Sequence, residues 1–273
     1  METIFPELTG LASFFLNSFR RTGGALEQTG TVIVKRTYNV NPATGALAPA
    51  ETALPIFESD QTIEIGPPDD RETIIQYEHD LAAIKPQGDL IVWGFVGPAG
   101  IQRLRVNGAT WHSRNIVAPA GETALFGWEP RVDSPRETQG NFPDDENAYP
   151  LPEPLPAGFD NLFYNGYRRD SAVAAPFRYF LPGDVLGVER DGSVDYEVTL
   201  GPETATATYY VYSGSGPDVE ARWQPHTLVM QRDTVVITPG EDACYVVWRA
   251  VWPFADHPAD AYRRLEVVFD ENA

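Results

Sequence analysis

The residue types that most often carry catalysis are spread along this chain rather than gathered in a motif. The four histidines, His79, His112, His226 and His257, lie far apart, so no H-x-H or HExxH pair is present. The single cysteine, Cys244, stands in an apolar run and is predicted to be a buried hydrophobic residue. The sequence has neither the G-x-S-x-G turn of serine hydrolases nor a glycine-rich phosphate loop. It therefore predicts no metal, no cofactor and no catalytic residue.

Carboxylates are the one class of catalytic side chain that the chain holds in excess, with 39 Asp and Glu residues. Four of them, Glu129, Asp133, Asp170 and Asp184, lie near aromatic or arginine residues. Two carboxylates roughly 5–10 Å apart across a cleft can hydrolyse a glycosidic bond. Sequence spacing does not supply that distance, so a carbohydrate-active enzyme with paired carboxylates stays an alternative function.

A second group of polar and aromatic residues is suited to binding a protein partner. Its members flank a proline-rich segment, and folding alone does not require such residues there. Aromatic and arginine side chains are the types enriched at interface hot spots. An ion pair that merely fixes the loop is the competing interpretation. The partner-binding candidates are Trp128, Glu129, Arg131, Tyr164, Asn165, Arg168 and Arg169.

The proline-rich segment runs from Asp133 to Gly158 and separates the chain into two stretches of strand-like sequence. It holds six prolines and an acidic knot at 144–146, so it cannot be a central strand. The sequence predicts a single domain over residues 1–273. Two β lobes within that domain, about 1–132 and 159–273, joined by the loop 133–158, are the alternative organisation.

The elements that carry these side chains are predicted to be mainly β-strands, because the chain is rich in turn-forming residues and alternating patterns. The chain holds 24 prolines and 23 glycines, which cut it into short apolar segments. In Thr31–Val40, apolar and polar residues alternate, which predicts a half-buried strand. Asn107-Gly108 and Asp191-Gly192 each separate two extended runs and predict tight hairpins. Short helices are expected only at Leu8–Phe19 and Pro258–Arg264.

We therefore expect many short antiparallel strands in sandwich-like or barrel-like sheets, with few short helices and one long proline-rich loop. Beside Thr31–Val40, strands are predicted at 62–65, 73–77, 90–96, 101–106, 110–112, 185–189, 194–200, 206–212, 219–223, 227–231, 234–238, 245–251 and 265–269.

Charge and hydropathy restrict the class of partner and the compartment. The formal net charge is −19, which argues against a protein that grips a nucleic-acid backbone. No apolar run approaches the ~20 residues that span a bilayer. The N-terminus lacks the basic start of a signal peptide, so we expect a cytoplasmic protein that binds neither nucleic acid nor membrane. The oligomeric state is left open.

Several short motifs follow one another along the chain: Thr31–Tyr38 (TVIVKRTY), Ile84–Gly94 (IKPQGDLIVWG), Leu104–Trp111 (LRVNGATW), Leu125–Glu129 (LFGWE), Gly158–Asn165 (GFDNLFYN), Gly183-Asp184, Leu228–Ile237 (LVMQRDTVVI) and Val247–Arg249 (VWR). No segment is specific alone, but their order and spacing across about residues 16–269 are specific. Together they resemble one bacterial family, a domain of unknown function found beside type VI secretion genes.

The resemblance implies a function as a non-enzymatic adaptor. Members of the family are described as proteins that help to load toxic effectors onto the PAAR-type tip of the secretion spike. The implied partners are a secreted effector, a PAAR-type spike protein, or both, and a chaperone-like β protein would cover their apolar edges by strand addition. Besides the carbohydrate-active enzyme, a structural or ligand-binding module of a phage-like injection machine remains an alternative.

Overall fold

The computed structural model describes most of the chain and leaves several loops undescribed. The described residues are 2–22, 25–59, 61–65, 72–77, 79–82, 85, 88–92, 94–96, 102–106, 109–116, 124–130, 172–175, 180–190, 193–212, 223–253 and 262–273. They form a mainly β protein, as the sequence predicts. Helix among them is confined to short 3-10 turns such as η4 (Pro239–Glu241).

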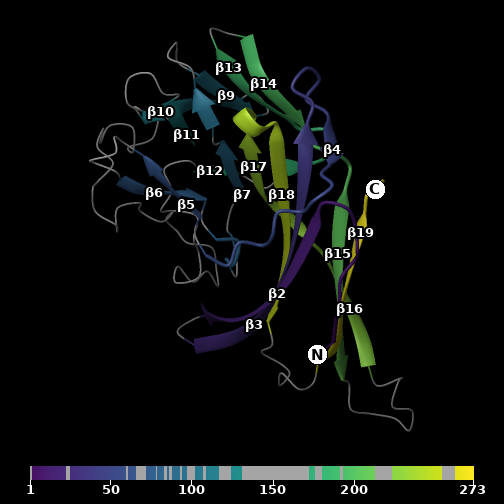
Figure 1. Cartoon of the computed structure of the whole chain (residues 1–273). Helices are drawn as coiled ribbons and strands as arrows, with labels where there is room; N and C mark the ends of the chain where they lie inside the picture. Colours follow the sequence, from purple (N-terminus) through teal and green to yellow (C-terminus); the bar gives the residue numbers. More distant parts are fainter. Residues whose placement is uncertain are drawn as a thin grey trace.

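The largest sheet, called the central sheet below, runs through the middle of the molecule (Figure 1). Its order is β12-β7-β17-β18-β3-β2, and β4 adds to the end of β3. The bounds are β2 Leu11–Thr22, β3 Ala25–Val40, β4 Leu47–Pro49, β7 Gly88–Val92, β12 Ala172–Ala175, β17 Gln231–Thr238 and β18 Ala243–Pro253. Neighbours are antiparallel except β7 and β17, which are parallel.

Two further sheets and one hairpin complete the described strands. The outer sheet has the order β1-β19-β15-β16, with bounds Glu2–Ile4, Tyr262–Asp270, Thr204–Tyr212 and Trp223–Val229. The upper sheet has the order β14-β13-β9-β10-β11-β8, with bounds Ser193–Thr199, Val185–Arg190, Gln102–Val106, Ala109–Ile116, Ala124–Pro130 and Gly94–Val96. β5 (Gln61–Ile65) pairs with β6 (Glu72–Tyr77).

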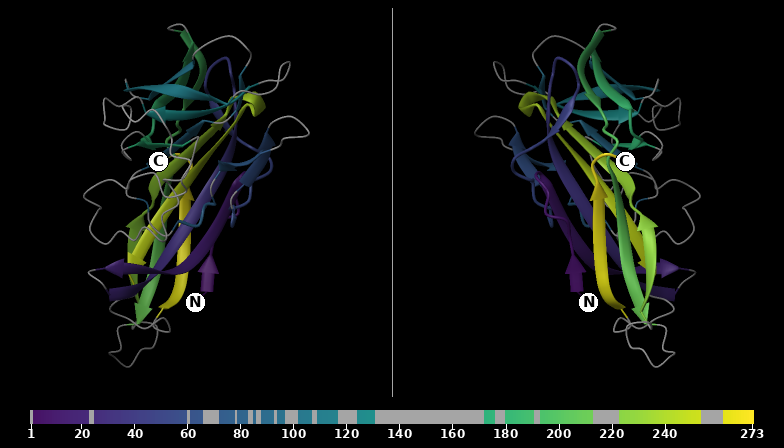
Figure 2. Two further views of the ribbon diagram at one scale, coloured as in Figure 1. Left: turned by 90° about the vertical axis from the view of Figure 1, so that its left-hand side faces the viewer. Right: turned by 90° about the vertical axis from the view of Figure 1, so that its right-hand side faces the viewer.

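The main hydrophobic core lies between the central and outer sheets, whose strands cross at an angle (Figure 2). From the central sheet it takes alternate residues of three strands, among them Val32, Val235 and Trp248, and from the outer sheet Ala207 and Val267. Residues of β13 and β14 close its upper end. Because side chains alternate between the faces of a strand, the sandwich follows directly from the period-two pattern.

The back face of the central sheet is buried as well, which corrects the prediction that β3 is half-buried. Ile33 joins a second cluster with Val236, Tyr245 and Val247 on that face. Thr31 and Lys35, expected in solvent, are both 0% exposed. Side chains of Ile56, Phe57 and Leu81 pack against this cluster, so β3 is covered on both sides.

Both predicted helices are wrong where the structure describes them. Leu8–Phe19 lies largely within β2, which pairs with β3 over its whole length, and Tyr262–Arg264 begins β19. The hairpins are confirmed: Val106 pairs with Ala109 across Asn107-Gly108, and Arg190 pairs with Ser193 across Asp191-Gly192.

Strands from both sides of the segment 133–158 share the same sheets. In the central sheet β17 and β18 pair with β7 and β3, and in the upper sheet β13 pairs with β9. The described sheets are therefore not divided at that segment. Within the described residues, no helix has the length and hydropathy of a membrane-spanning segment.

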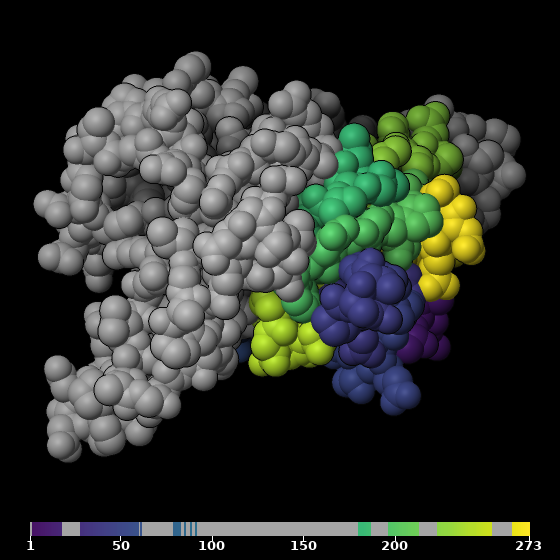
Figure 3. Space-filling model, turned by 90° about the horizontal axis from the view of Figure 1, so that it is seen from above, coloured from purple at the N-terminus to yellow at the C-terminus, as the bar shows by residue number. Residues whose placement is uncertain are grey.

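The upper end of the sandwich is closed by a turn that follows β3. Gly45 ends this turn with φ +70, a conformation that glycine adopts without steric cost. Its carbonyl accepts a hydrogen bond from the Thr199 N–H at 2.9 Å, which ties the turn to β14. Seen from above, the blue-violet turn and the green segment after residue 195 lie against each other (Figure 3).

Cys244 lies on β18 in the main core and is completely buried, as the sequence predicts. Burial raises the pKa of its thiol from 9.0 to about 12. Between these two values the unfolded thiol has lost its proton while the folded one retains it, so unfolding releases a proton and stability falls as pH rises. The cysteine therefore favours folding less at alkaline pH than at neutral pH.

Comparison of the wild type with Cys244→Ala isolates this effect, because every other titrating group is common to both proteins. The stability of the wild type relative to the variant is expected to fall by about 2 kcal/mol between pH 8 and pH 10.5. Urea unfolding at each pH, followed by tryptophan fluorescence, measures the difference. A difference that does not change with pH would show that the folded and unfolded thiols titrate together.

Candidate functional site

The residues predicted to bind a partner fall largely outside the described part of the chain. Trp128 and Glu129 lie in β11, where they pair with Ser113 and His112 of β10, and nothing is described of their side chains. The other candidates, Arg131, Tyr164, Asn165, Arg168 and Arg169, lie outside the described residues. Their role in binding stays a prediction.

Four segments that carry the family resemblance meet in the central sheet. They lie in β7, β17, β18 and β3, which are consecutive neighbours although their sequence positions run from 31 to 249. The polar residues of three of these segments form one hydrogen-bonded group. This group, called the Asp233 cluster below, consists of Lys85, Asp233, Thr234 and Arg249.

Every member of the Asp233 cluster is at least nine-tenths buried. The Arg249 Nε donates to Asp233 Oδ2 at 2.6 Å, and the Thr234 hydroxyl donates to Asp233 Oδ1 at 2.8 Å. The Lys85 ammonium donates to the Thr234 hydroxyl oxygen at 2.6 Å. The Arg249 Nη1 also donates to the Ala82 carbonyl, so the cluster ties the loop before β7 to β18.

A bulge in β17 brings the two adjacent members of the cluster to one face. Arg232 pairs with Trp248 and Thr234 pairs with Val247, so Asp233 is an extra residue without a partner on β18. An extra residue shifts the alternation of side chains by one position. Asp233 and Thr234 therefore both lie on the back face with Arg249, whereas Arg232 lies against Trp248, with its guanidinium 5.2 Å from the ring centroid.

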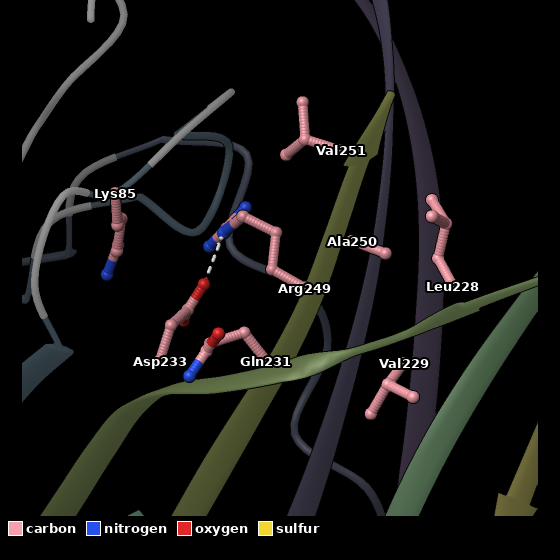
Figure 4. Close-up of a pocket in the computed structure, with 8 residues that line it drawn as sticks. All are labelled: Lys85, Leu228, Val229, Gln231, Asp233, Arg249, Ala250 and Val251. Carbon is pink, nitrogen blue, oxygen red and sulfur yellow. Dashed lines mark hydrogen bonds and ion pairs between the residues drawn. The ribbon is translucent and has the colours of Figure 1, made fainter. Parts of the chain in front are cut away.

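An open pocket of about 220 Å³ lies beside the Asp233 cluster. One part of its wall is polar, from Lys85, Gln231, Asp233 and Arg249. The other part is apolar and comes from the end of β16 and the end of β18 (Figure 4). The apolar lining residues are Leu228, Val229, Ala250 and Val251.

A second buried ion pair lies on the same back face of the sheet. The Lys35 ammonium is 3.0 Å from Asp80 Oδ2 and donates to the Pro55 carbonyl at 3.0 Å. It also lies 3.4 Å from the ring centroid of Phe57 and 4.3 Å from that of Tyr245. Burial lowers the pKa of Lys35, while the charge and hydrogen bond of Asp80 oppose that shift. Two buried cations, Lys35 and Arg249, thus hold Pro55, Asp80 and Ala82 against the central sheet.

The sequence interpretation missed Lys35 and Asp233 as centres of buried networks. One signal was present: Lys35 and Lys85 are the only lysines among 20 cationic residues. Both are buried, and each takes part in one of the two networks. A chain that uses arginine almost everywhere places its two lysines where a single compact ammonium group is bound.

The buried carboxylates of the described residues serve as partners of cations. Asp233 is bound by Arg249 and Asp80 by Lys35, and they belong to separate groups. Among the carboxylates proposed for sugar cleavage, Asp184 accepts the Leu181 N–H at 2.9 Å. Asp133 and Asp170 lie outside the described residues. In the described part of the chain, no three His, Cys, Asp or Glu side chains are grouped to hold a metal ion.

Comparison with family models, with curated proteins and with solved structures finds no match to this chain.

Proposed function

We propose that this chain is a non-enzymatic adaptor with a chaperone-like role in type VI secretion. It binds an effector or a PAAR-type spike-tip protein in the cytoplasm and holds it for loading. The supporting observation is the meeting of the resembling segments in the Asp233 cluster: Lys85, Asp233 and Arg249 come from three such segments. Short motifs that matched by chance have no reason to converge on one buried network.

Open strands of the sandwich supply a physical means of binding. Among the strands that the structure describes, β16 is the last of the outer sheet, and four consecutive residues of it, from Gln224 to Thr227, are exposed. An open strand pairs with an extended segment through backbone hydrogen bonds, which is how β proteins cover exposed strands of other proteins. The charge of −19 keeps such an adaptor soluble when its partner is not.

Co-expression tests the proposal. A PAAR-type spike-tip protein from the same bacterium is expected to be more soluble when produced with this chain, and to be retained by the tagged chain after washing. An unrelated acidic β-sandwich protein, produced at the same level, is the control for general effects of expression. Equal solubility of the spike-tip protein in both cases, without retention, would contradict the adaptor function.

A further inference from the structure

Arg36 is a buried cation of β3 that has few hydrogen-bond partners. It is 1% exposed, and its guanidinium lies between the central and outer sheets. Its Nη2 donates to the carboxylate of Glu271, the residue that follows β19. Its Nε and Nη1 are buried as well, and within the described part of the chain neither has a hydrogen-bond partner. Buried donors are almost always bound, so a guanidinium that uses one of its three nitrogens requires an explanation.

Arg232, on the same face of the central sheet, shows the contacts of an arginine that ties the backbone together. Its Nη2 donates to the backbone carbonyls of Gly201 and Glu203, at 3.0 Å and 2.7 Å, although its Nη1 is unpartnered too. These carbonyls cannot leave unless the segment that carries them moves. Arg36 depends instead on one side chain, that of Glu271, which is 43% exposed. Exposed side chains change rotamer freely, so this contact opens without loss of the fold.

Two aromatic rings hold the Arg36 guanidinium in place. Its Cζ lies 5.1 Å from the ring centroid of Phe269, on β19, and 5.7 Å from that of Tyr38, on β3. Aromatic rings at such distances attract a cation, and neither ring belongs to the segment that carries Glu271. The guanidinium therefore keeps its position when Glu271 turns away. A receptor group that is already held in position loses little conformational entropy when a ligand binds.

The geometry of a guanidinium decides which ligand suits Arg36 better than Glu271 does. Nη2 shares one edge of the group with Nε and another with Nη1, so a ligand on Nη2 lies beside both unpartnered nitrogens. Glu271 binds Nη2 through Oε1. An anion with two suitably spaced oxygens bridges Nη2 and a neighbouring nitrogen, and such bidentate pairs are the stronger form of this contact. Carboxylates and phosphates both have these oxygens.

We propose that Arg36 is the receptor for an oxyanion, either a phosphate or the carboxylate of another molecule, which displaces Glu271 and binds through two oxygens. Glu271 is the internal competitor that occupies the receptor until the oxyanion arrives. Binding then exchanges the single contact of Glu271 for a bidentate pair and frees the residues after β19 from the central sheet. This site goes beyond the proposed adaptor function and does not depend on it.

Calorimetric titration of the full chain tests the site. The probes are inorganic phosphate and a short acetylated peptide with a free C-terminal carboxylate, whose amidated form is the control for contacts of the peptide itself. Chloride keeps the ionic strength equal in all titrations, so that screening of surface charge does not pass for binding. Glu271→Ala removes the internal competitor and is expected to tighten binding of the oxyanion about tenfold.

Arg36→Met is expected to abolish binding, because it removes the guanidinium and retains most of the side-chain volume. Arg264→Met is the matched control: Arg264 lies on β19 of the outer sheet, but its side chain is 39% exposed and lies 3.3 Å from Glu266. This variant lowers the net charge by the same amount and is expected to bind as the wild type does. Urea unfolding verifies that each variant is folded. Glu271→Ala alters a half-exposed side chain, so it decides the question even if Arg36→Met does not fold.

The two probes distinguish the source of the oxyanion. Binding of phosphate supports a free anion, and binding of the peptide, but not of its amidated form, supports the carboxylate of another polypeptide. If Arg36→Met and Arg264→Met lower the affinity equally, the anion responds to overall charge and the site is wrong. If neither the wild type nor Glu271→Ala binds either probe, Arg36 serves only the fold and the proposal is overturned.

Discussion

Asp233→Asn is expected to lower the free energy of unfolding by about 3–5 kcal/mol, the usual cost of removing one partner from a buried ion pair. The substitution keeps the size of the side chain and removes its charge. The Arg249 guanidinium, 4% exposed, then stays buried with no counter-charge at Nε. Guanidinium groups in proteins do not release their proton, so the variant cannot escape the cost by neutralising the cation. Urea unfolding followed by tryptophan fluorescence measures the change.

An exposed ion pair in the same protein provides the control. Arg264 and Glu266 lie 3.3 Å apart on the outer sheet, with side chains 39% and 33% exposed. Glu266→Gln is expected to change stability by less than about 1 kcal/mol, because water screens the pair. The double variant Asp233→Leu/Arg249→Met is expected to recover much of the loss, since apolar side chains of similar volume replace the buried charges. Equal effects of Asp233→Asn and Glu266→Gln would show that the Asp233 cluster is not a buried electrostatic contact.

The strands and hairpins of this fold are predictable where local signals dominate. The alternation of apolar and polar residues along Thr31–Val40 correctly identifies the side chains that face the main core. An Asn-Gly or Asp-Gly pair correctly predicts the position of each tight hairpin. Such signals depend on residues that are adjacent in the chain. They therefore predict local structure independently of how distant parts of the chain pack.

The errors arise where both faces of a strand are covered. In β2, Leu11 and Phe15 pack against the main core, while Phe14 packs against the cluster on the back face. β2 makes apolar contacts on both faces although its described side chains are only partly buried, so its apolar run is nearly continuous and is not distinguishable from a helix by its period. The half-buried pattern of Thr31–Val40 misplaces Lys35 in the same way, because Pro55, Phe57 and Asp80, distant in sequence, pack around it on the back face.

The candidate site depends on contacts that no local pattern encodes. Lys85 and Thr234 are hydrogen-bonded although they are 149 residues apart in sequence. The bulge at Asp233 shifts which side chains share a face, and the parallel pairing of β7 with β17 brings the Lys85 loop alongside.

Asp80→Asn is the matching change in the second buried pair, and its effect is expected to depend on pH. Asp80 accepts hydrogen bonds from the Lys35 ammonium at 3.0 Å and from the Phe57 N–H at 2.8 Å. Asparagine retains an acceptor for the Phe57 N–H but leaves the lysine buried without its counter-charge. At neutral pH the loss is expected to be about 3–5 kcal/mol.

Unlike an arginine, the buried lysine can discard its proton, and this makes the effect of Asp80→Asn depend on pH. Burial already lowers the pKa of Lys35 from 10.5, and the loss of Asp80 removes the two interactions that oppose this shift. Between the lowered folded pKa and 10.5, the unfolded chain binds more protons than the folded one, so the stability of Asp80→Asn rises with pH. Relative to wild type, its deficit is expected to shrink by up to about 1.4 kcal/mol per pH unit between the folded-state pKa of Lys35 in the variant and the higher pKa that Asp80 maintains in the wild type. Unfolding of wild type and Asp80→Asn at pH 7, 8, 9 and 10 measures the deficit, and a deficit that is the same at every pH would mean that the loss of Asp80 does not lead Lys35 to neutralise in the fold.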